Sequence, residues 1–192
     1  MNTTTSREMP ARGVASSLNA AVAPKQLSTP VENLSGKAMS KATTETLKRK
    51  VKGQIVLPSD PSYDEVREIW NAMIDRRPAL IVRCAEASDV VHAISFAREN
   101  GLEISIRGGG HNIAGNALCD NGVMIDLSTM RRVRVDAEKK RAYVEPGATL
   151  ADFDEVAQSH GLATPVGINS TTGIAGLTLG GGFGWLTRKY GM

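Results

Sequence analysis

The spacing of apolar residues predicts four helices along the chain. A short helix from about Ala42 is expected to end at Gly53, and two longer helices are expected from Ser88 to Asn100 and from Thr149 to His160. The inner stripe of the helix from Ser88 is expected to consist of Val91, Ile94 and Ala97.

The fourth helix is predicted after Asp60 and Ser62, which are both candidate N-caps. Ser62 and Glu65 form a capping-box pattern, and Pro61 suits a first-turn position. Apolar residues then recur at helical spacing, so one face of this helix is expected to be buried. That face consists of Val66, Ile69, Trp70, Met73 and Ile74.

Short apolar runs between turn residues predict the strands. ALIV at 79–82 and EISI at 103–106 flank the helix from Ser88, which gives a βαβ unit. The other expected strands are Ile55 to Leu57, Val123 to Asp126, and a hairpin of Val133 to Val135 with Arg141 to Glu145. Together with the helices, these strands predict an α+β fold.

Charge is distributed unevenly along the 192 residues. Residues 1–50 hold eight Lys and Arg against three Glu, whereas the remainder holds fifteen against seventeen Asp and Glu. Phosphate binding needs basic groups on the folded surface, so we expect no nucleic-acid partner. Residues 1–40 are polar and lack periodicity, which predicts a flexible tail, with an organellar transit peptide as the less favoured alternative. We find no secretory signal and no apolar run near the roughly 18 residues of a membrane span, and therefore expect a cytoplasmic protein with no membrane partner.

The residue types that ligate metals are scattered. Cys84 and Cys119 form no CxxC pair and are expected to be reduced and mostly buried. His92 and His160 lack neighbouring ligand types, so no metal site is predicted. The carboxylates at 152, 154 and 155 are interpreted as the first turn of the helix that Thr149 caps.

Glycines concentrate in the second half of the chain, where sixteen of nineteen fall at or after Gly101. RGGGHN at 107–112 directly follows a predicted strand, and bare backbone of this kind can present several N–H groups to one phosphate. A sharp turn is the alternative, although one or two glycines would suffice for it. A second cluster at 170–185 combines hydroxyl groups with more bare backbone. Neither cluster matches a P-loop or a dinucleotide-binding fingerprint.

These motifs together resemble the FAD-linked oxidases of the vanillyl-alcohol oxidase and p-cresol methylhydroxylase (PCMH) superfamily, in the branch that contains berberine bridge enzyme. The resemblance runs from about residue 55 to the C-terminus. Its motifs are RGGGHNIAG at 107–115, VMIDLS at 123–128, VEPGATL at 144–150 and GINSTTGIAGLTLGGGFGWLTRKYG at 167–191.

The resemblance implies a PCMH-type FAD-binding domain of two α+β subdomains. Taken with the composition of the N-terminal part, the expected organisation is a flexible tail at 1–40, a helical lead-in at 41–75 and the FAD-binding domain at 76–192, incomplete at its C-terminal end. The first pyrophosphate loop would be formed by Arg107, Gly108, Gly109, Gly110, Asn112 and Gly115. The second would include Gly167, Ser170, Thr171, Thr172, Gly173, Gly176, Thr178, Gly180, Gly182 and Gly184.

The same resemblance assigns His111 to the histidine that attaches covalently to the flavin 8α-methyl group. Neutral imidazole is a competent nucleophile near pH 7, which suits this role. The alternative is that His111 orders the loop around noncovalent FAD. Some relatives carry a second link through a cysteine at the position of Asn169, so here a single link is expected.

The implied function is hydride transfer from a small organic substrate to FAD, with O2 as the expected acceptor. Alcohols, sugars, amines and alkaloid-like compounds all suit this branch, and a dehydrogenase that does not use O2 is an alternative. No residue is assigned as the catalytic base, which in relatives comes largely from segments that would lie beyond Met192. The sequence is therefore expected to be an N-terminal fragment, with an inert truncated product as a further alternative. The oligomeric state is not predicted.

Overall fold

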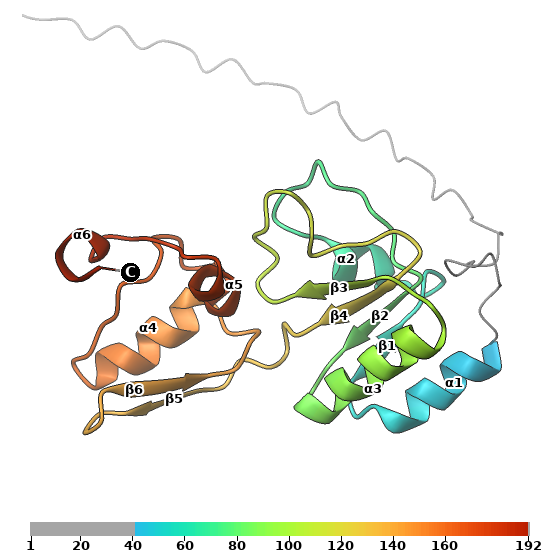
Figure 1. The fold of residues 1–192 in the computed structure, drawn as a ribbon, viewed down its shortest axis with the longest axis horizontal. Helices are drawn as coiled ribbons and strands as arrows, with labels where there is room; N and C mark the ends of the chain where they lie inside the picture. Colours follow the sequence, from blue (N-terminus) through green and yellow to red (C-terminus); the bar gives the residue numbers. More distant parts are fainter. Residues whose placement is uncertain (1–40, 192) are drawn as a thin grey trace, which may run out of the picture.

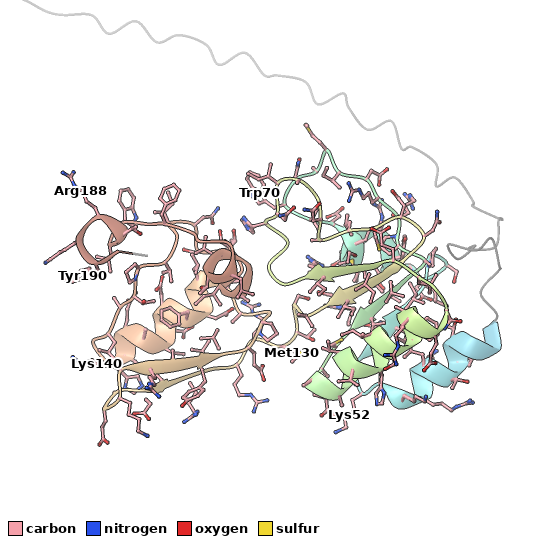
Figure 2. All side chains as sticks on the ribbon, viewed as in Figure 1. Lys52, Trp70, Met130, Lys140, Arg188 and Tyr190 are labelled. Atoms are coloured by element: carbon pink, nitrogen blue, oxygen red, sulfur yellow. The ribbon has the colours of Figure 1, made fainter. Side chains whose placement is uncertain are left out.

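The computed structural model describes residues 41–191, which form two α+β units (Figure 1), and the units are joined near Met130 (Figure 2). The tail predicted at 1–40 lies outside the described residues. The first unit contains α1 (Lys41–Lys50), β1 (Gln54–Val56), α2 (Tyr63–Arg67), β2 (Leu80–Arg83), α3 (Ala87–Glu99), β3 (Ile104–Arg107) and β4 (Val123–Asp126). The second contains β5 (Val133–Asp136), β6 (Arg141–Val144), α4 (Leu150–Ser159), α5 (Ile174–Leu179) and α6 (Thr187–Tyr190).

A four-stranded sheet with the order β1-β2-β4-β3 organises the first unit. β2 and β3 both run parallel to β4, which lies between them, and β1 is antiparallel to β2. Alternate residues of the strands point to opposite faces. Val123 and Ile125 pack with residues of α1 and α3, whereas Met124 packs with Tyr63 and Val66 of α2. The predicted βαβ unit is confirmed, and β4 is inserted into it.

The second unit is built on the predicted hairpin. β5 and β6 pair in antiparallel fashion, and α4 packs against the hairpin around Leu150 and Phe153. Thr149 caps α4, and together with Asp152 it forms a complete capping box. The prediction of a helix from Thr149 is therefore confirmed.

The helix predicted after Ser62 is much shorter than expected. α2 ends at Arg67, and Ser62 makes no side-chain cap hydrogen bond. Trp70 is 61 % exposed and Met73 is 88 % exposed, so the expected buried face is wrong at these two positions. The reason is a tertiary contact. Beyond Glu68 the chain leaves the helix, and the backbone N–H of Trp70 donates a hydrogen bond to the carbonyl oxygen of Gly110 in the glycine-rich segment at 107–112.

The inner stripe predicted for α3 is wrong at two of its three positions. Val91 is 61 % exposed and Ile94 is 42 % exposed, whereas Ala93, Phe96 and Ala97 are buried. α3 begins one residue before Ser88, and its N-cap is Glu86.

The buried carboxylate of Asp89 explains why α3 buries the face that also carries Ala93 and Phe96. It accepts hydrogen bonds from the backbone N–H groups of Lys52, Gly53 and Ala85, at 2.8 to 3.0 Å. Because a buried carboxylate needs such partners, Asp89 fixes the orientation of the helix.

Both cysteines are buried free thiols in the structure, as predicted. Burial raises the pKa of Cys84 to about 12 and also raises the pKa of Cys119. Of the helices between residues 41 and 191, none combines the length and the apolar character that a membrane crossing requires.

Candidate functional site

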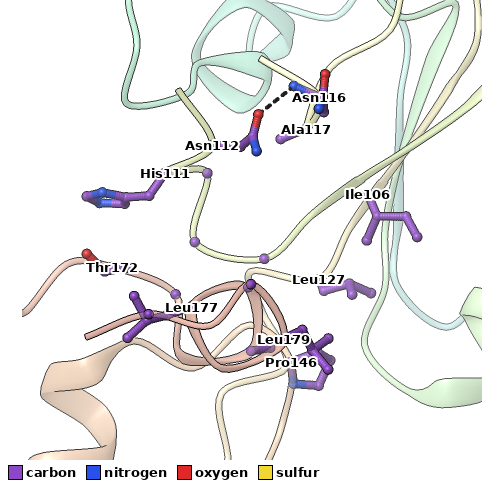
Figure 3. Close-up of a pocket in the computed structure, with 18 of the residues that line it drawn as sticks. Ile106, His111, Asn112, Asn116, Ala117, Leu127, Pro146, Thr172, Leu177 and Leu179 are labelled. Carbon is purple, nitrogen blue, oxygen red and sulfur yellow. Dashed lines mark hydrogen bonds between the residues drawn. The ribbon is translucent and has the colours of Figure 1, made fainter. Parts of the chain in front are cut away.

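A cavity of about 700 Å³ lies where the two units meet, and both predicted glycine loops contribute to it (Figure 3). The first loop, residues 107–115, leaves the end of β3. The second loop, residues 167–184, contains α5. Predicted site residues that line the cavity are Gly108, Gly109, Gly110, His111, Asn112, Thr172, Gly173, Gly176, Gly180 and Gly182.

The two loops touch through their backbones. A β carbon on Gly109 would lie 2.3 Å from the nitrogen of Gly173, and a β carbon on Gly108 would lie 2.9 Å from the carbonyl oxygen of Pro146. Real β carbons do not approach other atoms so closely. Glycine is therefore required at Gly109 and Gly173 for the two loops to converge.

The first loop presents backbone donors that the described residues leave without an acceptor. Within residues 41–191, no protein acceptor pairs with the backbone N–H groups of residues 108–112. The N–H groups of Gly173, Ala175 and Gly176 in the second loop are likewise without a described acceptor. Groups of adjacent free amides are a common binding surface for phosphate oxygens.

Arg107 anchors the start of the first loop. Its Nη1 donates to the carbonyl oxygen of Val66 at 2.7 Å, which ties the end of β3 to α2. Gly110 then takes a φ of +71°, a conformation that glycine adopts without strain. The buried Nε of Arg107 has no hydrogen-bond partner among the described residues.

Asp126 holds two arginines at the carboxyl ends of the parallel strands. The register pairs Asp126 of β4 with Arg83 of β2 and with Arg107 of β3. Arg83 Nε donates to the Asp126 carboxylate at 3.2 Å, and Arg107 Nη1 lies 3.9 Å from the same oxygen. The backbone N–H of Ser128 donates to the other oxygen at 3.0 Å. This fully buried carboxylate therefore fixes the strand ends from which the loop departs.

Residues 68–77, which we call the strap, run along the first loop instead of continuing α2. The N–H of Trp70 donates to the carbonyl oxygen of Gly110 at 3.1 Å, and the Asn71 amide donates to that of Ile113 at 2.8 Å. Arg76 donates to the carbonyl oxygens of Gly115 and Leu118 at 3.3 and 3.1 Å. The strap thus holds the shape of the loop from outside the cavity.

His111 lies between the strap and the second loop. Its ring stacks on that of Trp70, with the centroids 5.6 Å apart and the planes 22° apart. Trp70 lies on the side of the first unit that faces the second (Figure 2). Nε2 of His111 is 3.0 Å from Oγ1 of Thr171, so the imidazole is held from both sides.

Several predicted residues belong to the loops but do not line the cavity. A β carbon on Gly184 would lie 1.7 Å from the carbonyl oxygen of Val166, and one on Gly115 would lie 2.7 Å from the Ile74 side chain. These glycines allow close packing within or beside the loops. The predicted residues outside the lining are Arg107, Gly115, Gly167, Ser170, Thr171, Thr178 and Gly184.

Apolar side chains that the sequence did not single out complete the cavity. Leu127 and Pro146 occur within the VMIDLS and VEPGATL motifs, so the motifs contained a signal for them. The other apolar residues come from the end of β3, from the loop after Asn112 and from α5, and five of them also lie within the quoted motifs. They are Ile106, Ile113, Ala114, Ala117, Ala175, Leu177 and Leu179, and the polar Asn116 lines the cavity as well.

The arrangement can therefore hold an elongated ligand that has an anionic part and a flat apolar part. The free amides suit the anionic part, and the aliphatic lining suits the flat part. Within residues 41–191, no group of three or more His, Cys, Asp or Glu side chains is placed to hold a metal ion.

A protein-family comparison decides which elongated ligand this is. The model described as FAD binding domain matches residues 78–192, a range that includes both glycine loops. The chain belongs to the FAD binding domain family. The resemblance inferred from the glycine motifs is thereby confirmed. The predicted PCMH-type fold is confirmed as well, because solved structures with this fold match the chain.

Two curated relatives illustrate the FAD binding domain family. An uncharacterized FAD-linked oxidoreductase of Bacillus subtilis is 42 % identical over 145 residues, which are 76 % of this chain and 32 % of the relative. The (R)-6-hydroxynicotine oxidase of Paenarthrobacter nicotinovorans is 39 % identical over 142 residues, 74 % of this chain and 31 % of that enzyme. The chain thus spans about a third of the length of these relatives.

Solved structures agree with this FAD-binding fold. The 6-hydroxy-D-nicotine oxidase of Arthrobacter nicotinovorans gives a TM-score of 0.72 at 40 % identity, covering 73 % of this chain and 31 % of that one. The BBE-like 1 protein of Physcomitrella patens gives 0.73 at 26 % identity, covering 78 % and 33 %. The grass pollen allergen Phl p 4, which has glucose dehydrogenase activity, gives 0.72 at 29 % identity, covering 78 % and 33 %.

Proposed function

We propose that the protein is the FAD-binding part of an oxidoreductase that transfers a hydride from a small organic substrate to covalently attached FAD. The observation that carries the proposal is the convergence of the two glycine loops and His111 on one cavity. When bound, FAD supplies the acceptor for two electrons and a proton from the substrate. The chain supplies the binding, the orientation and the point of attachment.

The cavity fits the chemistry of FAD. The pyrophosphate would be held by the free amides of residues 108–112, and by those of Gly173, Ala175 and Gly176 from the second loop. The bare backbones of Gly108 and Gly109 leave no side chain between the amides and the phosphate oxygens. Ile106, Leu127 and Pro146 offer apolar surface to the flat parts of the cofactor.

His111 is the proposed point of attachment. When FAD is bound, a ring nitrogen of His111 would bond to the flavin 8α carbon, with loss of one methyl C–H hydrogen and of the imidazole N–H hydrogen. O2 would take up the two electrons and two protons and become hydrogen peroxide. The position of His111 on the cavity wall, held by Trp70 and Thr171, supports this role. Since Asn169 stands where some relatives have a cysteine, a single link is proposed.

O2 is the proposed electron acceptor during turnover, and a dehydrogenase is the second candidate. The name 6-hydroxynicotine oxidase, which occurs among both the curated relatives and the solved structures, favours the oxidase. The glucose dehydrogenase activity stated for Phl p 4 favours the alternative, since that protein shares this fold at 29 % identity. The rate at which photoreduced, protein-bound flavin is reoxidised by dissolved O2 distinguishes them.

The test of the proposed function is the intact mass of the purified full chain after incubation with FAD and denaturation. We expect 20.4 kDa plus the mass of one FAD, whereas the His111→Ala variant should retain the mass of the bare polypeptide. Equilibrium dialysis with FAD serves as the control, because H111A should still bind the cofactor noncovalently. A bare wild-type mass would disprove covalent attachment, and the absence of any FAD binding would disprove the proposed function.

A further inference from the structure

Asn169 and Thr171 form a short hydrogen-bonded chain that ends on His111. The carboxamide oxygen Oδ1 of Asn169 lies 2.9 Å from Oγ1 of Thr171, and that same Oγ1 lies 3.0 Å from Nε2 of His111. Their contacts determine which nitrogen of His111 carries the proton.

The amide orientation of Asn169 is fixed independently of the histidine. The backbone N–H of Thr171 donates to Oδ1 of Asn169 at 3.1 Å. An amide NH2 group could not accept this bond, so the atom that faces Thr171 must be the oxygen. The Asn169 side chain therefore presents only an acceptor to the Thr171 hydroxyl.

The proton of the Thr171 hydroxyl is thereby assigned. A hydroxyl has a single proton to donate, and here it is donated to Asn169 Oδ1. Toward His111 the same oxygen can only accept, so Nε2 must carry a hydrogen. In a neutral imidazole the other nitrogen, Nδ1, then has a free lone pair. Within residues 41–191, no polar atom is hydrogen-bonded to Nδ1 of His111.

The ring is also held in its plane. Trp70 stacks on His111, and the backbone N–H of Trp70 is bonded to the Gly110 carbonyl oxygen in the same loop. Rotation of the imidazole by half a turn about the Cβ–Cγ bond would put the carbon Cε1 where Nε2 lies, and the hydrogen bond to Thr171 would be lost. The stack and the hydrogen bond together keep one nitrogen toward Thr171 and leave the other free.

We propose that Asn169 and Thr171 are positioning residues that hold His111 as the Nε2–H tautomer, so that Nδ1 is the nucleophilic nitrogen. The inference rests on the proposed function in one respect, since a nucleophile matters only if the flavin is attached through His111. The tautomer itself is a property of this chain and can be measured without flavin.

The test is the tautomer ratio of His111 in the full chain without FAD, from two-bond ¹H–¹⁵N correlations of the imidazole at a pH of about 8.5, where neutral imidazole predominates. H111A identifies the signals among the three histidines of the sequence. Thr171→Val should lower the ratio of Nε2–H to Nδ1–H about 2- to 10-fold, the effect of one net hydrogen bond. Thr171→Ser retains the hydroxyl and should restore the ratio.

Asn169→Ala should lower the ratio further than Thr171→Val, because the Thr171 hydroxyl is then free to donate to Nε2 and favours the Nδ1–H form. The double variant N169A/T171V should match T171V, since the effect of Asn169 passes through the hydroxyl. Thr164→Val, an exposed threonine outside the cavity lining, is the matched control and should leave the ratio unchanged. A merely structural role for Asn169 and Thr171 would not produce this order.

Attachment of FAD, followed by intact mass over time, separates this inference from the proposed function. We expect the rate of attachment to follow the tautomer ratio. It should fall in T171V, fall further in N169A and be retained in T171S. If the ratios follow the predicted order but no variant, including the wild type, acquires FAD, the proposed function is wrong and the tautomer assignment stands. If the wild type is mainly Nδ1–H, or if N169A leaves the ratio unchanged, the inference is overturned.

Discussion

Gly109 and Gly173 meet backbone to backbone at the point where the two loops converge. A β carbon on Gly109 would lie 2.3 Å from the Gly173 nitrogen, and one on Gly173 would lie 2.5 Å from the Gly109 nitrogen. The contact links residues 64 positions apart in the sequence, and it closes the wall of the cavity between the two units.

The variant Gly109→Ala should therefore separate the loops. We expect a loss of about 1–3 kcal/mol in the free energy of unfolding, the usual cost of forcing atoms into a packed site, and weaker FAD binding. Urea denaturation and calorimetric titration with FAD measure the two effects. Gly176→Ala is the control for stability, because its β carbon meets nothing within 4 Å and alanine favours the α5 helix. Wild-type stability and affinity in G109A would contradict the role of the contact.

The variant Asp126→Asn tests the anchor beneath the first loop. The fully buried carboxylate accepts hydrogen bonds from Arg83 and from the Ser128 N–H, and Arg107 lies close to it. A neutral amide in its place would leave the two arginines without a paired negative charge. We expect a loss of about 1–3 kcal/mol in unfolding free energy, measured by urea denaturation.

Asp136→Asn is the matched control for Asp126→Asn, because Asp136 also ends a strand but pairs with the exposed Lys139. Its cost should be about 0–1 kcal/mol. Equal losses in the two variants would show that the Asp126 cluster is no more important than a surface ion pair.

The variant Asn71→Ala tests the strap. It removes the hydrogen bond to the Ile113 carbonyl oxygen while leaving the backbone bond of Trp70 in place. The amides of Gly115, at the end of the first loop, and of Leu118, just after it, should exchange with solvent about 2- to 10-fold faster, in line with the loss of one hydrogen bond. Met73→Ala, an exposed strap residue, should not change these rates. Unchanged exchange in N71A would mean that the strap does not hold the loop.

The strap also shows what the sequence could not reveal. Apolar spacing after Ser62 continues to Ile74 and locally favours a helix, but the carbonyl groups of the first loop compete for the same segment. Those partners lie about 40 residues further along the chain, so no local pattern reports them. The α3 stripe fails for a related reason, since Asp89 is polar in the sequence and fully buried in the fold.

The elements and the loops that were predicted correctly depend on local information. β4 is a run of buried residues, and the Thr149 cap uses residues three positions apart, so both are visible in a short window. The glycine loops were visible because runs of glycine stand out in the sequence. Their mutual contact and the hydrogen bonds of Asn169 to Thr171 depend on three-dimensional distances, and only the structure supplies these.

Acid should weaken the second unit through Asp152. The hydrogen bonds from Arg131, at 2.7 and 2.9 Å, lower the pKa of this carboxyl against the opposing effect of burial, and Thr149 contributes further bonds. A group whose pKa is lower in the folded state stabilises the fold above its unfolded value of about 3.9. That stabilisation is lost as the pH falls through the lower, folded-state pKa.

Asp152→Asn should therefore be less stable than the wild type at a pH of about 6, and the difference should shrink once the pH falls below about 3.9. Arg131→Gln should reproduce this pattern, because it removes the main cause of the lowered pKa. The double variant should lose less than the sum of the two single losses, since both substitutions break the same pair. The measurement is the unfolding free energy from urea titrations across this pH range. A wild-type advantage over D152N that stays constant down to a pH of about 2 would show that the Arg131 pairing is not the source of acid sensitivity.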